Sequence, residues 1–102
     1  MVTGKQKRLS PIHPGAVLAE ILDEAGLSAN ALALALRVPA NRLGAIVKGQ
    51  RRISADTALR LARYFGTTAQ MWLNLQTKYD LALAEDAALD RIAREVLPRS
   101  AA

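Results

Sequence analysis

The sequence contains no cysteine and only one histidine among its 102 residues. The absence of cysteine excludes disulfides, thiolate nucleophiles and zinc sites with sulfur ligands, and one histidine leaves too few nitrogen ligands for a transition-metal site. No apolar run approaches the roughly 20 residues of a membrane-spanning helix, and residues 1–13 lack the apolar stretch of a signal peptide. We therefore expect a cytoplasmic protein without a metal or other cofactor.

Alanine and leucine are abundant, and together they supply 36 of the 102 residues. Both residue types favour helix, whereas sheets are built largely from β-branched and aromatic side chains. A chain of this length forms one domain. The composition therefore predicts a single all-α domain.

Positive charge is concentrated in one segment of the chain. The net charge is +5, and residues 37–52 alone contain five bases and no acid. The rest of the chain therefore sums to zero. A basic cluster of this kind suggests a polyanionic partner, and the alternative is a solvated charged face.

Capping residues divide the chain into helices. Ser28, Ser54 and Thr68 are good N-caps, while glycine at positions 26, 49 and 66 suits the left-handed residue that ends a helix. Apolar side chains at helical spacing between these boundaries predict five helices. They cover residues 14–26, 28–36, 39–49, 54–66 and 68–84, and the apolar set of the fourth includes Leu59.

A sixth amphipathic helix is predicted near the end of the chain. It follows a charged interruption at Glu85 and Asp86 and extends to Pro98. Its apolar stripe consists of Leu89, Ile92, Ala93, Val96 and Leu97.

The two short helices between Ser28 and Gly49 form the part of the chain that predicts function. Only residues 37–39 join them, and the small Ala33 stands where the helices must approach closely, which is the pattern of a helix-turn-helix. Residues 31–36 alternate alanine and leucine as a strand would. We reject a strand there, because both residues are strong helix formers and the segment follows a good cap.

The segment from Leu27-Ser-Ala-Asn to Val47-Lys-Gly resembles the helix-turn-helix of phage repressors and Xre regulators. A longer set of motifs resembles the HigA (VapI) antitoxins over roughly residues 12–83. The motifs are Ile12-His-Pro-Gly, Val38-Pro-Ala-Asn-Arg-Leu, Lys48-Gly-Gln-Arg-Arg-Ile-Ser, Tyr64-Phe-Gly-Thr, Trp72-Leu-Asn-Leu-Gln and Tyr79-Asp-Leu.

The resemblance implies a lambda-repressor-like fold of five to six helices and a type II antitoxin. Such a protein binds operator DNA as a dimer, represses its own operon and neutralises a HigB-like toxin, a ribosome-dependent mRNA endonuclease. The implied organisation is a flexible basic N-terminal arm over residues 1–11, the DNA-binding domain over 12–84, and a C-terminal helix and tail over 85–102.

A recognition helix of this type lays its N-terminal end in the major groove. The positions expected to face the bases are Ala40, Asn41, Gly44 and Ala45, with Arg42 at the margin. Asn41 can pair with adenine, the two alanines can touch thymine methyls, and Arg42 can bind guanine or phosphate. Gly44 lowers helix stability by about 1 kcal/mol relative to alanine, and either lets the backbone approach the bases or fits against a neighbouring helix.

Phosphate contacts are expected at the start of the second helix, in the turn, and after the third helix. The candidates are Ser28, Asn30, Arg37, Lys48, Gln50, Arg51 and Arg52. Lys5, Lys7 and Arg8 of the N-terminal arm either reach the DNA or belong to a solubilising tail.

The sequence departs from the family pattern in two ways. Arg37 occupies a turn position where the family commonly has a left-handed glycine, at a cost of about 1 kcal/mol if that conformation is kept. In addition, Ala29, Gly44 and Ala45 stand where the family often has polar residues. Base readout should therefore rely on methyl contacts and DNA shape more than on hydrogen bonds.

A dimer or toxin interface is expected on the C-terminal part of the chain, which contains more apolar residues than a small core needs. The candidates are Met71, Leu89, Ile92, Val96 and Leu97. Trp72 and Leu75 are expected in the core instead.

The sequence leaves three other interpretations. An enzyme is disfavoured, because His13 precedes a helix-opening proline and Asp23 and Glu24 are neighbours on a solvated helix end. A phage-type repressor without a toxin partner would lack a small basic toxin gene directly upstream. A toxin-binding protein that has lost DNA binding would account for the alanines on the recognition helix.

Overall fold

The computed structural model describes residues 11–100, which form five α-helices and no strand. The helices are α1 (Pro14–Ala25), α2 (Ala29–Leu36), α3 (Ala40–Val47), α4 (Ala55–Phe65) and α5 (Ala69–Glu95). The all-α fold predicted from the composition is therefore confirmed. None of these helices is both long enough and apolar enough to cross a membrane. Lys5, Lys7 and Arg8 of the predicted basic arm lie outside the described residues.

The predicted caps define the helix ends. The hydroxyls of Ser28, Ser54 and Thr68 each accept a hydrogen bond from the backbone N–H three residues later, at 3.0 to 3.2 Å. Gly26 and Gly66 end α1 and α4 in the left-handed conformation, with φ of 66° and 74°. Local sequence thus determines where the helices begin and end.

The core lies between α1–α4 and the first turns of α5. It is built mainly from aliphatic side chains of α1–α4 and is closed by Trp72, which is fully buried. The indole Nε1 of Trp72 donates to the Thr67 hydroxyl at 2.9 Å, so the one polar atom of that side chain has a partner. The predicted core position of Trp72 is confirmed, and Leu75 is half-buried against the same cluster.

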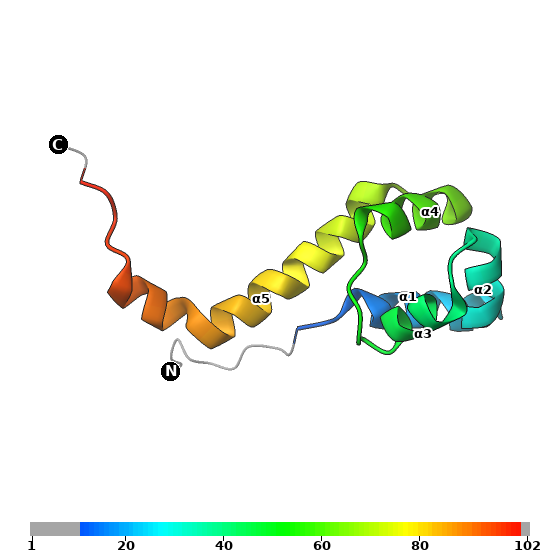
Figure 1. Ribbon diagram of the computed structural model, residues 1–102, viewed down its shortest axis with the longest axis horizontal. Helices are drawn as coiled ribbons and strands as arrows, with labels where there is room; N and C mark the ends of the chain where they lie inside the picture. Colours follow the sequence, from blue (N-terminus) through cyan, green and yellow to red (C-terminus); the bar gives the residue numbers. More distant parts are fainter. Residues whose placement is uncertain (1–10, 101–102) are drawn as a thin grey trace.

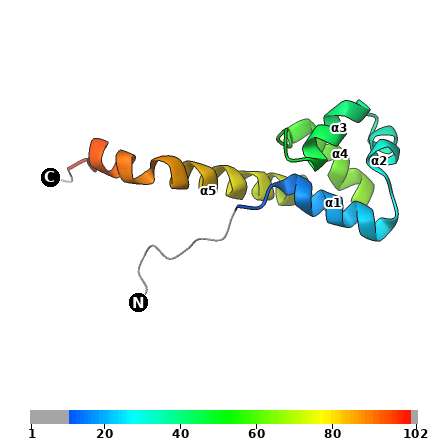
Figure 2. The ribbon, with the colours of Figure 1, turned by 90° about the horizontal axis from the view of Figure 1, so that it is seen from below.

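Helix α5 extends far beyond this core. In Figures 1 and 2 its first turns lie against α4 and α1, and its remainder projects away from the body toward the C-terminus. The separate sixth helix predicted after Glu85 and Asp86 is wrong, because a single helix runs through both residues. Residues 69–95 contain no glycine or proline, and charged residues are compatible with helix interiors.

Two helix boundaries and one burial prediction also differ from expectation. Helix α5 ends at Glu95 and not at Pro98, and Val96, two residues before Pro98, is already extended at φ −112° and ψ 110°. Pro39 is the N-cap of α3 and precedes its first turn. Leu59, expected on the buried stripe of α4, is 63% exposed.

Candidate nucleic-acid interface

The turn between α2 and α3 has the left-handed geometry that the family's glycine would allow. Arg37 adopts φ 62° and ψ 44°. Among residues 11–100, it is the only residue other than glycine that has a positive φ. Its N–H donates to the Leu34 carbonyl at 3.2 Å, and the N–H of Val38 donates to the Ala33 carbonyl at 3.0 Å. The exposed Arg37 side chain therefore costs backbone strain but leaves the turn intact.

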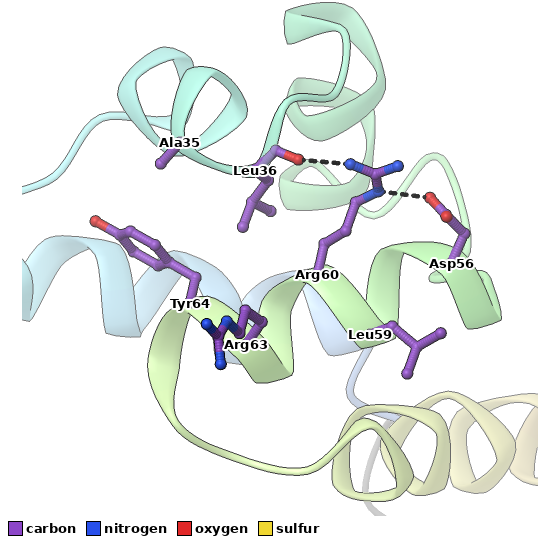
Figure 3. Close-up of a pocket in the computed structure, with 7 residues that line it drawn as sticks. All are labelled: Ala35, Leu36, Asp56, Leu59, Arg60, Arg63 and Tyr64. Atoms are coloured by element: carbon purple, nitrogen blue, oxygen red, sulfur yellow. Dashed lines mark hydrogen bonds and ion pairs between the residues drawn. The ribbon is translucent and has the colours of Figure 1, made fainter.

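Helix α4 contacts the end of α2 next to this turn through Arg60 (Figure 3). The Nη1 of Arg60 donates to the carbonyl of Leu36 at 3.0 Å, and its Nε donates to Asp56 at 2.8 Å. The Leu36 carbonyl is one of the C-terminal acceptors that an α-helix leaves unpaired, so Arg60 satisfies it. The contacts border a shallow hollow of about 370 Å³. It is lined by Ala35, Leu36, Asp56, Leu59, Arg60, Arg63 and Tyr64.

One side of α3 is open. Leu43 and Ile46 are buried in the core, and the predicted base-facing positions lie on the other side of the helix. Of these, Ala40 and Asn41 are exposed, while Gly44 and Ala45 are half-buried.

Gly44 borders empty space. A Cβ at this position would have no atom within 4 Å among residues 11–100, apart from its chain neighbours and the backbone of its own helix. This finding contradicts the alternative that Gly44 fits against a neighbouring helix of the same chain. The other explanation for a glycine at this position is the close approach of a bound partner.

Arg42, predicted at the margin of the base-facing positions, lies on the first turn of α3. The residue is half-buried, and its Nε is buried without a hydrogen-bond partner among residues 11–100. An unpaired buried donor has an energetic cost.

The N-terminus of α2 presents polar groups without negative charge. Ser28 and Asn30 are exposed, and the Ser28 hydroxyl accepts the Ala31 N–H, so its own proton remains free to donate. Neither α2 nor α3 has an acidic residue in its first turn. The partial positive charge of both helix N-termini is therefore not offset locally.

The loop after α3 contains the remaining phosphate candidates. Lys48, Gln50, Arg51 and Arg52 are all exposed. The loop begins with the Gln50 N–H bonded to the Ala45 carbonyl at 2.8 Å and turns through Gly49 at φ 75°. Exposed basic side chains thus follow α3 directly in the chain.

Two residues of α5, which occur in the quoted family motifs but were not among the predicted site residues, hold the end of this loop that leads into α4. The buried Gln76 accepts the Ile53 N–H at 2.8 Å and donates to Asp80 at 3.0 Å, and Asp80 forms an ion pair with Arg52 at 3.0 Å. The sequence offers one signal for this arrangement. Gln76 follows the buried Trp72 by one helical turn, where an apolar residue would be expected.

His13 has a structural position at the start of α1. Its Nδ1 accepts the Gly15 N–H at 2.8 Å, and its ring meets Tyr79 edge-on with centroids 4.8 Å apart. Burial lowers the pKa of His13 below its ordinary value of 6.5, and nearby Asp80 partly opposes that shift. No group of three potential metal ligands gathers among residues 11–100.

The predicted interface residues fall into two groups. Met71 is half-buried on the first turn of α5 and packs against the core. Leu89 and Ile92 are about half exposed on the projecting part of α5, and Val96 and Leu97 lie exposed beyond its end.

The helix-turn-helix family matches this chain over residues 18–72. Virulence-associated protein I of Dichelobacter nodosus is 57% identical over 81 residues, which cover 78% of this chain and 75% of that protein. A solved addiction module antidote protein of the HigA family from Coxiella burnetii is 51% identical, with a TM-score of 0.86 over 89% of this chain and all of that one.

Another solved structure is that of the Pseudomonas aeruginosa antitoxin HigA with the higBA promoter. It is 50% identical, with a TM-score of 0.85 over 88% of this chain and 99% of that one. The matches extend beyond the helix-turn-helix into the remaining helices, as the sequence motifs predicted. The chain belongs to the HigA family of helix-turn-helix antitoxins.

Proposed function

We propose that this antitoxin binds operator DNA as a dimer, represses its own operon and neutralises a HigB-like mRNA-cleaving toxin. The observation that best supports DNA binding is the set of exposed groups around α3. One side of α3 is open, α2 with its acid-free N-terminus contacts α3, and the basic loop at residues 48–52 follows α3 directly in the chain. In addition, no acidic residue occurs between residues 25 and 55. A polyanion that approaches α2, α3 and the loop therefore meets no acidic side chain from residues 25–55.

On this surface we assign direct base contact to α3. Asn41 is exposed at its first turn and has the donor and acceptor that match adenine in the major groove. Ala40 and Ala45 offer methyl groups to thymine, and Gly44 allows the backbone to come close. Arg42 is half-buried at this helix, and the terminal N–H groups of its guanidinium are the donors that could bind a guanine or a phosphate.

Phosphate contacts would position α3 on the duplex. At the α2 end, the free proton of the Ser28 hydroxyl and the amide of Asn30 are the donors. At the other end, Lys48, Gln50 and Arg51 extend from the loop. We include Arg37, whose exposed side chain lies in the turn between the two helices.

The relative from Pseudomonas aeruginosa supports this assignment, because it was solved with the higBA promoter and shares half of its residues with this chain. A single module makes few base contacts. A two-fold dimer would read two half-sites about 34 to 36 Å apart.

We assign the partner surface to the projecting part of α5. Leu89 and Ile92 lie three residues apart and therefore on one face of the helix, with Val96 and Leu97 beyond its end. Burying such side chains against a partner is favourable. The second protomer or the toxin would cover them. The proposal includes no catalytic step.

The DNA-binding part is tested by fluorescence anisotropy with a duplex from the promoter upstream of the chain's own reading frame. Wild-type protein should bind it more tightly than a scrambled duplex. Asn41→Ala should lose roughly 1 to 3 kcal/mol at one base pair and bind the scrambled duplex as before. Equal binding of both duplexes by the wild type would refute operator recognition.

The toxin part is tested by co-purification with the product of the adjacent reading frame. Recovery of a small basic protein whose mRNA cleavage stops on binding is the expected result. If no such product binds, the chain is a repressor without a toxin partner, which is the alternative function.

A further inference from the structure

We infer that Asp80 of α5 is a positioning residue for DNA binding, because it holds Arg52 and the basic loop at residues 48–52 in place for phosphate contact. The inference rests on the proposed function, since operator DNA is the partner that the loop would meet. Asp80 itself is an acid beside a surface proposed to bind a polyanion, and its presence there needs a reason.

The contacts form a closed ring between the loop and α5. The N–H of the buried Ile53 donates to the Oε1 of Gln76 at 2.8 Å, and the Nε2 of Gln76 donates to the Oδ1 of Asp80 at 3.0 Å. The Oδ2 of Asp80 then pairs with the Nη1 of Arg52 at 3.0 Å. Because Arg52 and Ile53 are neighbours, the ring is closed through their shared peptide bond.

The hydrogen bond between Gln76 and Ile53 and the ion pair between Asp80 and Arg52 differ in burial, and this difference indicates the role of each contact. Gln76 is 2% exposed and Ile53 is 1% exposed, so their hydrogen bond anchors the loop to the core. The Arg52 side chain is 65% exposed and that of Asp80 is 37% exposed. The ion pair therefore lies at the surface, where it orients Arg52 without removing it from solvent.

A guanidinium has five N–H donors, so one ion pair leaves others available for a phosphate. A free arginine side chain loses rotamer freedom when it binds. Because Asp80 already restricts the Arg52 side chain, part of its rotamer entropy is lost during folding. Less entropy is then lost when DNA binds, so binding is stronger.

Two effects of Asp80 on DNA affinity have opposite signs. Its negative charge repels phosphate, so by charge alone its removal would strengthen binding. Its hold on Arg52 favours binding, so by positioning its removal would weaken binding. The direction of change in an Asp80→Asn variant therefore separates the two effects.

The experiment measures Kd on the promoter duplex at several salt concentrations for full-length wild type, Asp80→Asn, Arg52→Ala and the double variant. We expect Asp80→Asn to bind about two- to fivefold more weakly, as for a part-exposed ion pair. The slope of log K against log salt should fall in magnitude by up to about 0.9, one phosphate contact. In the Arg52→Ala background, Asp80→Asn should no longer weaken binding, because only the effect of its charge remains, and Kd should be unchanged or slightly lower.

A matched control is Asp23→Asn, which removes an exposed carboxylate of the same type from α1. It should leave Kd and slope unchanged or bind slightly tighter. The asparagine oxygen at position 80 can still accept from Gln76, so the loop anchor should persist, and the thermal unfolding midpoint checks this. If Asp80→Asn does not fold, Arg52→Ala alone must show the same loss of affinity and slope.

The inference is overturned if Asp80→Asn binds as tightly as wild type or tighter, with an unchanged slope. It is also overturned if Arg52→Ala leaves both quantities unchanged. A wild-type protein that does not bind the promoter duplex would instead refute the proposed function, so the two failures are distinguishable.

Discussion

Gly15 of α1 and Ile46 of α3 meet with no room for a side chain between them. A Cβ at position 15 would overlap the Ile46 carbonyl oxygen, and both residues are buried. The contact sets how closely α3 lies to α1. It therefore determines the position of the helix proposed to enter the major groove.

Gly15→Ala should destabilise the fold, because α1 and α3 must move apart to admit the methyl group. We expect the free energy of unfolding to fall by about 1 to 3 kcal/mol, measured by urea denaturation. Since backbone atoms cannot move aside as a flexible side chain does, a stability equal to that of the wild type would contradict the packing described.

Gly44→Ala is the matched substitution in open space. No described atom would contact its methyl group, so helix propensity should raise the free energy of unfolding by about 0.5 to 1 kcal/mol. The same methyl should weaken promoter binding if the helix backbone lies against the bases. A variant that is more stable and binds the promoter unchanged would exclude that close approach.

Stability should decrease in mild acid because of His13. Its Nδ1 accepts the Gly15 N–H and must be unprotonated to do so, and burial lowers its pKa below 6.5, with Asp80 opposing the shift. The folded state therefore releases the proton at lower pH than the unfolded state. The contribution is complete above about pH 6.5 and is lost as pH falls through the folded-state pKa.

The measurement is the free energy of unfolding between pH 5 and pH 8, for wild type and for His13→Asn. Asparagine is a good N-cap that does not titrate, so the variant should lose the part of the pH dependence due to His13. Identical pH profiles for the two proteins would show that His13 is not responsible.

Leu89→Ser combined with Ile92→Ser should impair assembly without unfolding the protein. Both side chains are about half exposed and touch no core residue, so the thermal midpoint measured on the monomer should change little. Sedimentation should detect a weaker dimer, or pull-down a weaker toxin complex. Unaltered dimerisation together with full toxin neutralisation would exclude this face as an interface.

Local signals in the sequence were enough to predict much of the fold. Ser28, Ser54 and Thr68 each act as the cap that their residue type and position indicated. The buried positions of Leu18, Leu32 and Leu43 likewise agree with the helical apolar spacing on which the predicted helices were based, because capping and helical period depend on residues within one or two turns.

The remaining features depend on contacts that local patterns do not encode. The bond between Ile53 and Gln76 spans 23 residues, and no spacing rule predicts which loop amide a buried glutamine accepts from. The charged pair Glu85 and Asp86 suggested a helix break. Two acids do not end a helix without a glycine or proline, and the helix continues through them.

The central claim, that α3 and the basic loop bind operator DNA, is tested most directly by the salt dependence of promoter affinity. Lys48 and Arg51 are the best loop positions to replace, because Arg52 already pairs with Asp80. A suitable control replaces Lys78 and Arg63 with alanine, two exposed bases on α5 and α4.

Lys48→Ala combined with Arg51→Ala should weaken promoter and scrambled duplexes alike and reduce the magnitude of the slope of log K against log salt by about 2. The control should retain the wild-type slope. An unchanged slope in the loop variant, or an equal reduction in the control, would contradict the account.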